Sequence, residues 1–216
     1  MAVFTFQTVA THAKGGAQYA DRMSRAVARA VSIFGHPMLV LPLAALALAL
    51  LRGQNRLALW MGLGFALFAA LVMAYSWWQV RRGRWAHVDA SGKEERRSLN
   101  RFLLVVLVVS ALFAAWQGHA RELALGLALS AAMVAVATAT ARWWKLSLHM
   151  AFVVFAAMLL GNVSWWAGLA GLFFAAAVAW SRLRLRRHVP RDLVAGALTG
   201  ALAGAIFMFL LAKGAA

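Results

Sequence analysis

The chain has 216 residues, of which 64% are hydrophobic and only 13% are charged, and its mean hydropathy is +0.75. Soluble domains are usually about 25% charged, so this composition excludes an ordinary soluble domain. The net charge of +16 would suggest a nucleic-acid partner in a soluble protein. Here the basic residues stand between long apolar runs, which predicts loops at lipid headgroups and no nucleic-acid binding. The chain has no cysteine, which excludes disulfides, thiolate metal sites and cysteine nucleophiles.

Residues 1–30 form a polar to amphipathic segment without the apolar region and cleavage site of a removable signal peptide. Arg22, Arg25 and Arg29 recur there at helical spacing. Two interpretations are equally open: a basic helix lying on the membrane surface, or the frayed start of the first span. We therefore expect two parts, an N-terminal basic segment over 1–30 and a single transmembrane domain over 31–216.

Long apolar segments follow, and about 20 such residues cross the hydrocarbon core of a bilayer as a helix. Because a bilayer offers the backbone no hydrogen-bond partners, runs of this kind predict helices. We expect an all-α polytopic bundle of six or seven spans. The segments lie near 31–51, 57–79, 102–117, 121–141, 148–163, 165–181 and 193–212. The segments 148–163 and 165–181 are short, which leaves a re-entrant hairpin open as an alternative.

Two segments carry residues that shape helices. Pro37 and Pro42 in the first segment predict a kink, and His36, next to Pro37, is interpreted as a structural residue facing the bundle interior. In the last segment, Gly196, Gly200 and Gly204 recur every four residues. Glycine at this spacing predicts a flat helix face that a neighbouring helix approaches closely.

With seven spans, the loops at 80–101, 142–147 and 182–192 fall on the same side as the N-terminus. Most basic residues lie on that side too, and the exceptions among the 22 are Arg52, Arg56, Arg121 and Lys213. Basic residues in short loops stay in the cytoplasm during insertion. The sequence therefore predicts an integral protein of a bacterial inner membrane, with these loops at the cytoplasmic face and the C-terminus outside.

The loop at 182–192 contains the residues best suited to chemistry. His188 and Asp192 are four residues apart, a spacing that brings two side chains together on one face of a helix. A carboxylate on one ring nitrogen fixes the tautomer of an imidazole and leaves the other nitrogen free to attack. Arg182 supplies a fork of donors that suits phosphate oxygens.

Two further segments on the same side complete the pattern. His149 stands at the start of an apolar segment, where it could serve as a general acid. The loop around residues 89–98 adds cationic donors, among them Lys93 and Arg97. Two histidines, a carboxylate and several cations on one face predict phosphoryl transfer, in which clamping the phosphoryl oxygens is the main task of the protein.

Residues 181–192 resemble the third motif of the type 2 phosphatidic acid phosphatase superfamily, Ser-Arg-x5-His-x3-Asp, and match it at every defined position. The second family motif, Pro-Ser-Gly-His, corresponds to residues 146–149, where Ser147 and His149 are kept. The first motif, Lys-x6-Arg-Pro, is matched at Arg97; Ala90 stands at the lysine position and Lys93 is the nearest cation. The resemblance covers roughly residues 80–212.

The resemblance implies a bundle like the core of that family and a phosphatase of lipid phosphates that needs neither a metal nor a cofactor. His188 would attack phosphorus and form a phosphohistidine, Asp192 would orient it, and His149 would protonate the leaving group. The phosphoryl oxygens would be held by Lys93, Arg97, Ser147 and Arg182. The expected partners are the bilayer and a membrane lipid phosphate.

Two other classes of function are weighed against this one. A catalytically inactive relative that binds lipid or serves as a scaffold is the runner-up. A transporter or channel is disfavoured because the spans carry no ionisable residues at mid-membrane. Phosphatidic acid, phosphatidylglycerophosphate and isoprenyl phosphates or diphosphates are all candidate substrates, and the oligomeric state is left open.

Overall fold

The computed structural model describes residues 3–88, 90, 92–118 and 121–213, with side chains described from residue 18 onward. Within these ranges the structure is all-helical and contains no strand. The helices, in chain order, are α1 (Val3–Phe34), α2 (Pro37–Leu51), α3 (Asn55–Arg81), α4 (Lys93–Trp116), α5 (Arg121–Thr140), α6 (Leu148–Gly161), α7 (Trp165–Arg184) and α8 (Pro190–Lys213).

By length and composition, five of these helices can cross a membrane: α3, α4, α5, α7 and α8. The bent pair formed by α2 and the part of α1 from Gln18 onward would make a sixth. The outer surface of the bundle is apolar; Leu63, Leu67 and Leu71, for example, are exposed along α3. Exposed apolar side chains on so many helices suit contact with lipid rather than water. The protein is therefore an all-helical integral membrane protein.

Tryptophan side chains gather near both ends of these spans. Trp77 and Trp78 lie under the guanidinium groups of Arg81 and Arg82, at 3.8 and 4.1 Å. Near the opposite end of the bundle, Trp116, Trp165 and Trp166 are exposed. Belts of this kind mark the two membrane interfaces of a helical protein.

Helix α6 lies at the centre of the bundle, where it packs against α2, α5, α7 and α8. All residues from Met150 to Ala157 are buried, so this helix is apolar on every side because it is enclosed by protein. Its 14 residues give a length of about 21 Å, which is short of the hydrocarbon thickness of about 30 Å. The segment predicted at 148–163 is thus a central buried helix, packed antiparallel to α7.

Small residues allow helices to approach α6 closely. A Cβ atom on Gly200 would lie 2.2 Å from the carbonyl oxygen of Ala151, and one on Gly196 would lie 2.4 Å from that of Ser147. The close approach predicted from the glycine spacing of the last segment is therefore confirmed, and α6 is the helix that makes it. Helix α8 carries residues of the candidate site, so this contact also sets the site's geometry.

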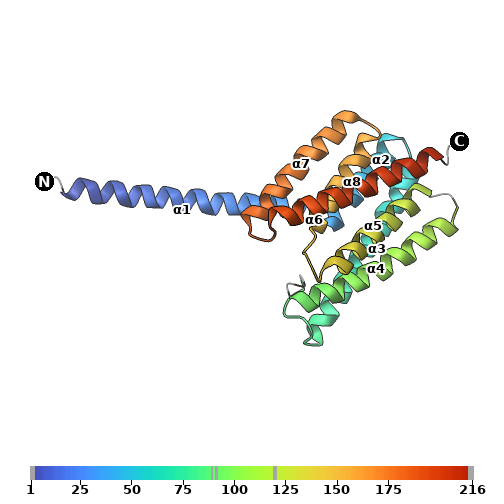
Figure 1. Cartoon of the computed structure of the whole chain (residues 1–216), viewed down its shortest axis with the longest axis horizontal. Helices are drawn as coiled ribbons and strands as arrows, with labels where there is room; N and C mark the ends of the chain where they lie inside the picture. The colour runs from blue at the N-terminus through green and yellow to red at the C-terminus, as the bar shows by residue number, and fades with distance from the viewer. Residues whose placement is uncertain (1–2, 89, 91, 119–120, 214–216) are drawn as a thin grey trace.

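The predicted first span, 31–51, is not a single helix. The chain breaks at Gly35 and His36, where α1 and α2 meet at a bend of 57°. Of the two prolines expected to kink this segment, Pro37 stands at the bend as the first residue of α2, whereas α2 continues past Pro42. Helix α1 runs unbroken through residue 30 and projects away from the bundle (Figure 1).

The loops that follow α3, α5 and α7 lie at the end of the bundle toward which α1 projects, and the C-terminus lies at the other end (Figure 1). This is the arrangement that the order of the apolar segments predicts. The candidate site is built at the first of these ends.

Candidate active site

The loop between α7 and α8 places His188 and Asp192 side by side. Helix α7 ends at Arg184; two residues later Arg186 lies in the left-handed region (φ 51°), and the Arg187 N–H donates to the carbonyl oxygen of Arg182 at 3.0 Å. This helix-ending turn reverses the chain, and Pro190 then starts α8. The distance from His188 Nδ1 to Asp192 Oδ2 is 3.3 Å, and the two side chains are only 6% and 7% exposed.

Nearby backbone groups stabilise the carboxylate of Asp192. The Val189 N–H donates to Asp192 Oδ2 at 3.4 Å, and the carboxylate lies in the first turn of α8, where the helix dipole favours a negative charge. A carboxylate at His188 Nδ1 assigns the ring proton to that nitrogen. His188 Nε2 then keeps a free lone pair, as a nucleophile requires.

The linker between α5 and α6 is tied to this loop by two hydrogen bonds. The Ser147 N–H donates to the carbonyl oxygen of Asp192 at 3.2 Å, and Lys145 Nζ donates to that of Arg187 at 3.0 Å. His149 follows as the second residue of α6. The second and third predicted motifs therefore meet in space, although more than 30 residues separate them in sequence.

Arg182 lies in the last turn of α7 and reaches toward α1. One of its terminal nitrogens, Nη1, donates to Ser32 Oγ at 2.8 Å. Its Nε is buried and has no hydrogen-bond partner among the described residues, and the same is true of Ser147 Oγ. Buried polar atoms are nearly always satisfied in native proteins, so two such atoms on the predicted phosphate-binding residues call for a ligand or water that would complete them.

Burial, together with two nearby cations, keeps His188 neutral. Burial lowers its pKa, the nearby cations Arg182 and Lys145 lower it further, and Asp192 opposes them. The imidazole is therefore uncharged at neutral pH, the state in which it can attack. Partial burial also lowers the pKa of Lys145, and the cations around it, Arg96 foremost, act in the same direction.

Lys93 and Arg97, the two cations predicted from the first motif, lie on the protein surface. Lys93 and Arg97 belong to the first turns of α4 rather than to a loop, because Glu95 caps the helix by accepting the Gly92 N–H at 2.7 Å. Both side chains are exposed, and Arg97 pairs with Glu94 at 3.3 Å. Within the described residues, neither forms a hydrogen bond or ion pair with His149, His188 or Arg182.

The sequence gives no sign that Ser32 lies beside the site, and its pattern around His149 includes Lys145 without predicting that Lys145 anchors the α7–α8 loop. The sequence also favours a structural role for His36, whereas the structure places its ring against His149. Ser32 carries no local signal at all, because its contact with Arg182 spans 150 residues of sequence. The His-Pro pair at 36–37, at the start of α2, is the local sequence feature that could have indicated the bend between α1 and α2.

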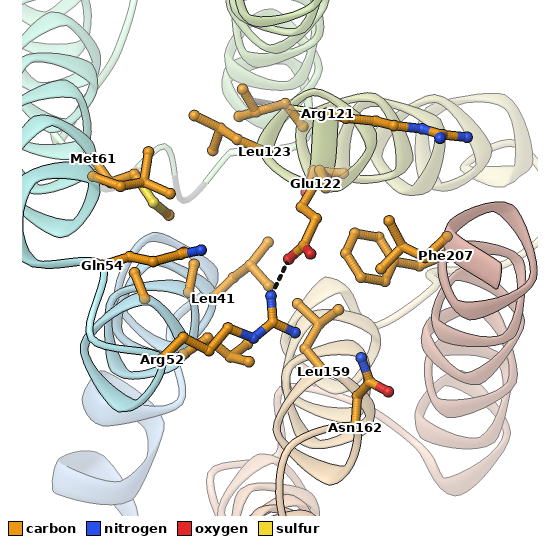
Figure 2. A pocket seen from close by; sticks show the side chains of 18 of the residues that line it. Leu41, Arg52, Gln54, Met61, Arg121, Glu122, Leu123, Leu159, Asn162 and Phe207 are labelled. Carbon is orange, nitrogen blue, oxygen red and sulfur yellow. Dashed lines mark hydrogen bonds and ion pairs between the residues drawn. The ribbon is translucent and has the colours of Figure 1, made fainter. Parts of the chain in front are cut away.

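A hollow lies toward the opposite end of the bundle. Its volume is about 390 Å³, and its walls come from α2, α3, α5, α6 and α8. Arg52 and Glu122 form an ion pair of 2.6 Å across it (Figure 2). Asn162, at the end of α6 remote from His149, also lines it. We therefore do not assign the reacting phosphate to this hollow.

Within the described part of the chain, no three His, Cys, Asp or Glu side chains are grouped as a metal site would need. No protein-family profile, no curated protein and no solved structure matches this chain. The case for a function therefore rests on the residues of the site.

Proposed function

We propose that this protein is a metal-independent phosphatase of membrane lipid phosphates, acting through a phosphohistidine intermediate. The observation that carries the proposal is the buried His188–Asp192 pair, with the linker that leads to His149 hydrogen-bonded to it. Arg182 adds a buried donor, its Nε, that finds no partner in the described part of the chain. These are the groups that nucleophilic attack on phosphorus requires.

In the first step, His188 Nε2 attacks phosphorus, and the bond from phosphorus to the lipid oxygen breaks. The negative charge of the bound phosphate keeps His149 protonated, and His149 gives that proton to the leaving oxygen, so the lipid leaves as an alcohol, or as a phosphate when the substrate is a diphosphate. Asp192 stabilises the positive charge that develops on the ring of His188. In the second step, His149, now neutral, takes a proton from water as the water oxygen attacks phosphorus. The bond from phosphorus to His188 Nε2 breaks, which releases inorganic phosphate and returns a neutral His188.

The phosphoryl oxygens carry negative charge through both steps. Arg182 is the first donor to them in this proposal, with Ser147 Oγ as a second buried group and Lys145 as a neighbouring cation. Lys93 and Arg97 are exposed, so their contribution is the positive potential that draws an anionic headgroup to this end of the bundle. The distribution of basic residues argues that this end faces the cytoplasm of a bacterial cell.

The test is phosphate release by the purified protein in detergent, with EDTA present, from phosphatidic acid, phosphatidylglycerophosphate and isoprenyl phosphates and diphosphates. Turnover of at least one of them, lost in His188→Ala, is the expected result. His87→Ala, an exposed histidine at the same end, is the matched control. Lipid binding without turnover of any substrate would favour the catalytically inactive alternative instead.

A further inference from the structure

The elbow between α1 and α2 brings a third imidazole to the site. The ring centroids of His36 and His149 are 5.2 Å apart, and the ring planes meet at 88°, an edge-to-face contact. His36 Nδ1 accepts the Met38 N–H at 3.3 Å and so caps α2. A neutral imidazole that accepts at Nδ1 carries its proton on Nε2. The orientation of the His36 ring is thus set by the start of α2.

Packing holds this elbow in place. Gly35 is buried, and a Cβ atom there would lie 2.5 Å from Val178 Cγ2, so only glycine allows α1 to end so close to α7. Pro37 is the first residue of α2, where its restricted φ suits a helix start. One turn before the bend, Ser32 accepts a hydrogen bond from Arg182. The elbow therefore contacts two groups of the proposed site from outside the three motifs.

The ring of His149 is half-buried at the start of α6, and hydrogen bonds do not fix its orientation within the described residues. Among the described residues it forms no side-chain hydrogen bond, and its ring contact is the one with His36. A general acid has to lie within hydrogen-bond reach of the oxygen that it protonates. An imidazole free to rotate would spend much of its time out of reach, and small displacements of a catalytic group reduce rates steeply.

We propose that His36 is a positioning residue, whose ring holds the imidazole of His149 in the rotamer that protonates the leaving oxygen. This inference rests on the proposed phosphatase function. It predicts that loss of the ring slows substrates whose leaving group needs a proton. Substrates whose leaving group departs as a stable anion are spared, because His149 has little to do in their first step.

Two substitutions distinguish the contact of the His36 ring with His149 from the role of His36 as the cap of α2. His36→Asn keeps a side-chain acceptor for the start of α2 but removes the ring, whereas His36→Phe keeps an aromatic ring against His149 but removes the acceptor. We expect His36→Asn to lower kcat for a lipid phosphate by about tenfold to 100-fold, with KM nearly unchanged. Its kcat for p-nitrophenyl phosphate should stay close to wild type, and His36→Phe should restore most of the rate on the lipid phosphate.

Ser32, in the last turn of α1, provides a comparison variant for His36→Asn. Ser32→Ala removes a partner of Arg182, so it should weaken phosphate binding for both substrates alike, and His87→Asn should change neither rate. Equal losses of His36→Asn on both substrates, or failure of His36→Phe to rescue, would overturn the positioning role in favour of a structural cap or a proton carrier.

A readout independent of turnover comes from the imidazole nitrogen NMR signals of His149 in protein labelled with ¹⁵N-histidine. His36→Asn should shift and broaden them, and His36→Phe should do so less. Unchanged His149 signals would refute the inference whatever the activity. A wild-type protein that hydrolyses neither substrate would refute the proposed function instead, so the two failures are distinguishable.

Discussion

Replacement of Gly196 by alanine tests whether the contact between α8 and α6 sets the geometry of the site. A Cβ atom at this position would lie 2.4 Å from the Ser147 carbonyl oxygen and 3.0 Å from Met150 Cβ. An ordinary contact needs at least 3.4 Å, so the first turns of α8 must retreat from α6 by about 1 Å. Asp192 lies one turn earlier on α8, and its carbonyl oxygen accepts the Ser147 N–H. The retreat would strain that bond and separate His188 from His149.

The expected effect on activity is much larger than the effect on stability. Overpacking of a tight interior destabilises by about 1–3 kcal/mol, and alanine in place of glycine in a helix offsets about 1 kcal/mol of that. A net loss of about 1 kcal/mol lowers Tm by about 2–4 °C in a protein of this size. By contrast, a misplacement of about 1 Å in an active site can reduce the rate by about 100-fold.

The measurements are phosphate release and thermal unfolding in detergent, followed by intrinsic tryptophan fluorescence. Gly64→Ala is the matched control, because no atom lies within 4 Å of a Cβ there. Gly200→Ala should lower Tm with a smaller effect on activity, since its clash with the Ala151 carbonyl lies one turn further from the site. If Gly196→Ala matches Gly64→Ala in both rate and Tm, the close packing of α8 on α6 described above is wrong.

Three other predictions concern the chemistry and its location. His188→Ala should abolish turnover, and Asp192→Asn should reduce kcat by about 10²–10⁴-fold. Both variants should keep the wild-type Tm, and EDTA should not change either result. Substantial activity of His188→Ala would show that another residue is the nucleophile. Lys145 lowers the pKa of His188, so Lys145→Gln should move the acid limb of the kcat/KM profile to higher pH. Asp192 raises that pKa, so Asp192→Asn should move the acid limb to lower pH. Shifts in the opposite directions would contradict the charge arrangement around His188. Alkaline phosphatase fused after Asn100 should be inactive and green fluorescent protein fused there should fluoresce, whereas the reverse pattern would place the site in the periplasm.

Much of the architecture could be predicted because it depends on local composition and on short spacings. Long apolar runs have to become helices in a bilayer, and alternating loops then have to share a membrane face. The spacing of four between His188 and Asp192 predicts their proximity, although α8 begins only at Pro190, so the contact joins the end of the loop to the first turn of the helix. The glycines of α8 predict a close helix neighbour, because a helix places residues at their spacing on one face. None of these inferences needs knowledge of which helices meet.

The tertiary structure decided the rest, because contacts between distant segments leave no periodic trace in a sequence. An apolar run looks the same whether lipid or protein surrounds it, so only packing reveals that α6 is the enclosed centre of the bundle. The sequence places Lys93 and Arg97 in a loop, but α4 begins at Lys93, earlier than the apolar segment predicts, because Glu95 caps it. The bend at Gly35 and His36 depends on Val178, far along the chain. Through that bend, His36 comes to lie against His149, a contact that the sequence alone does not encode.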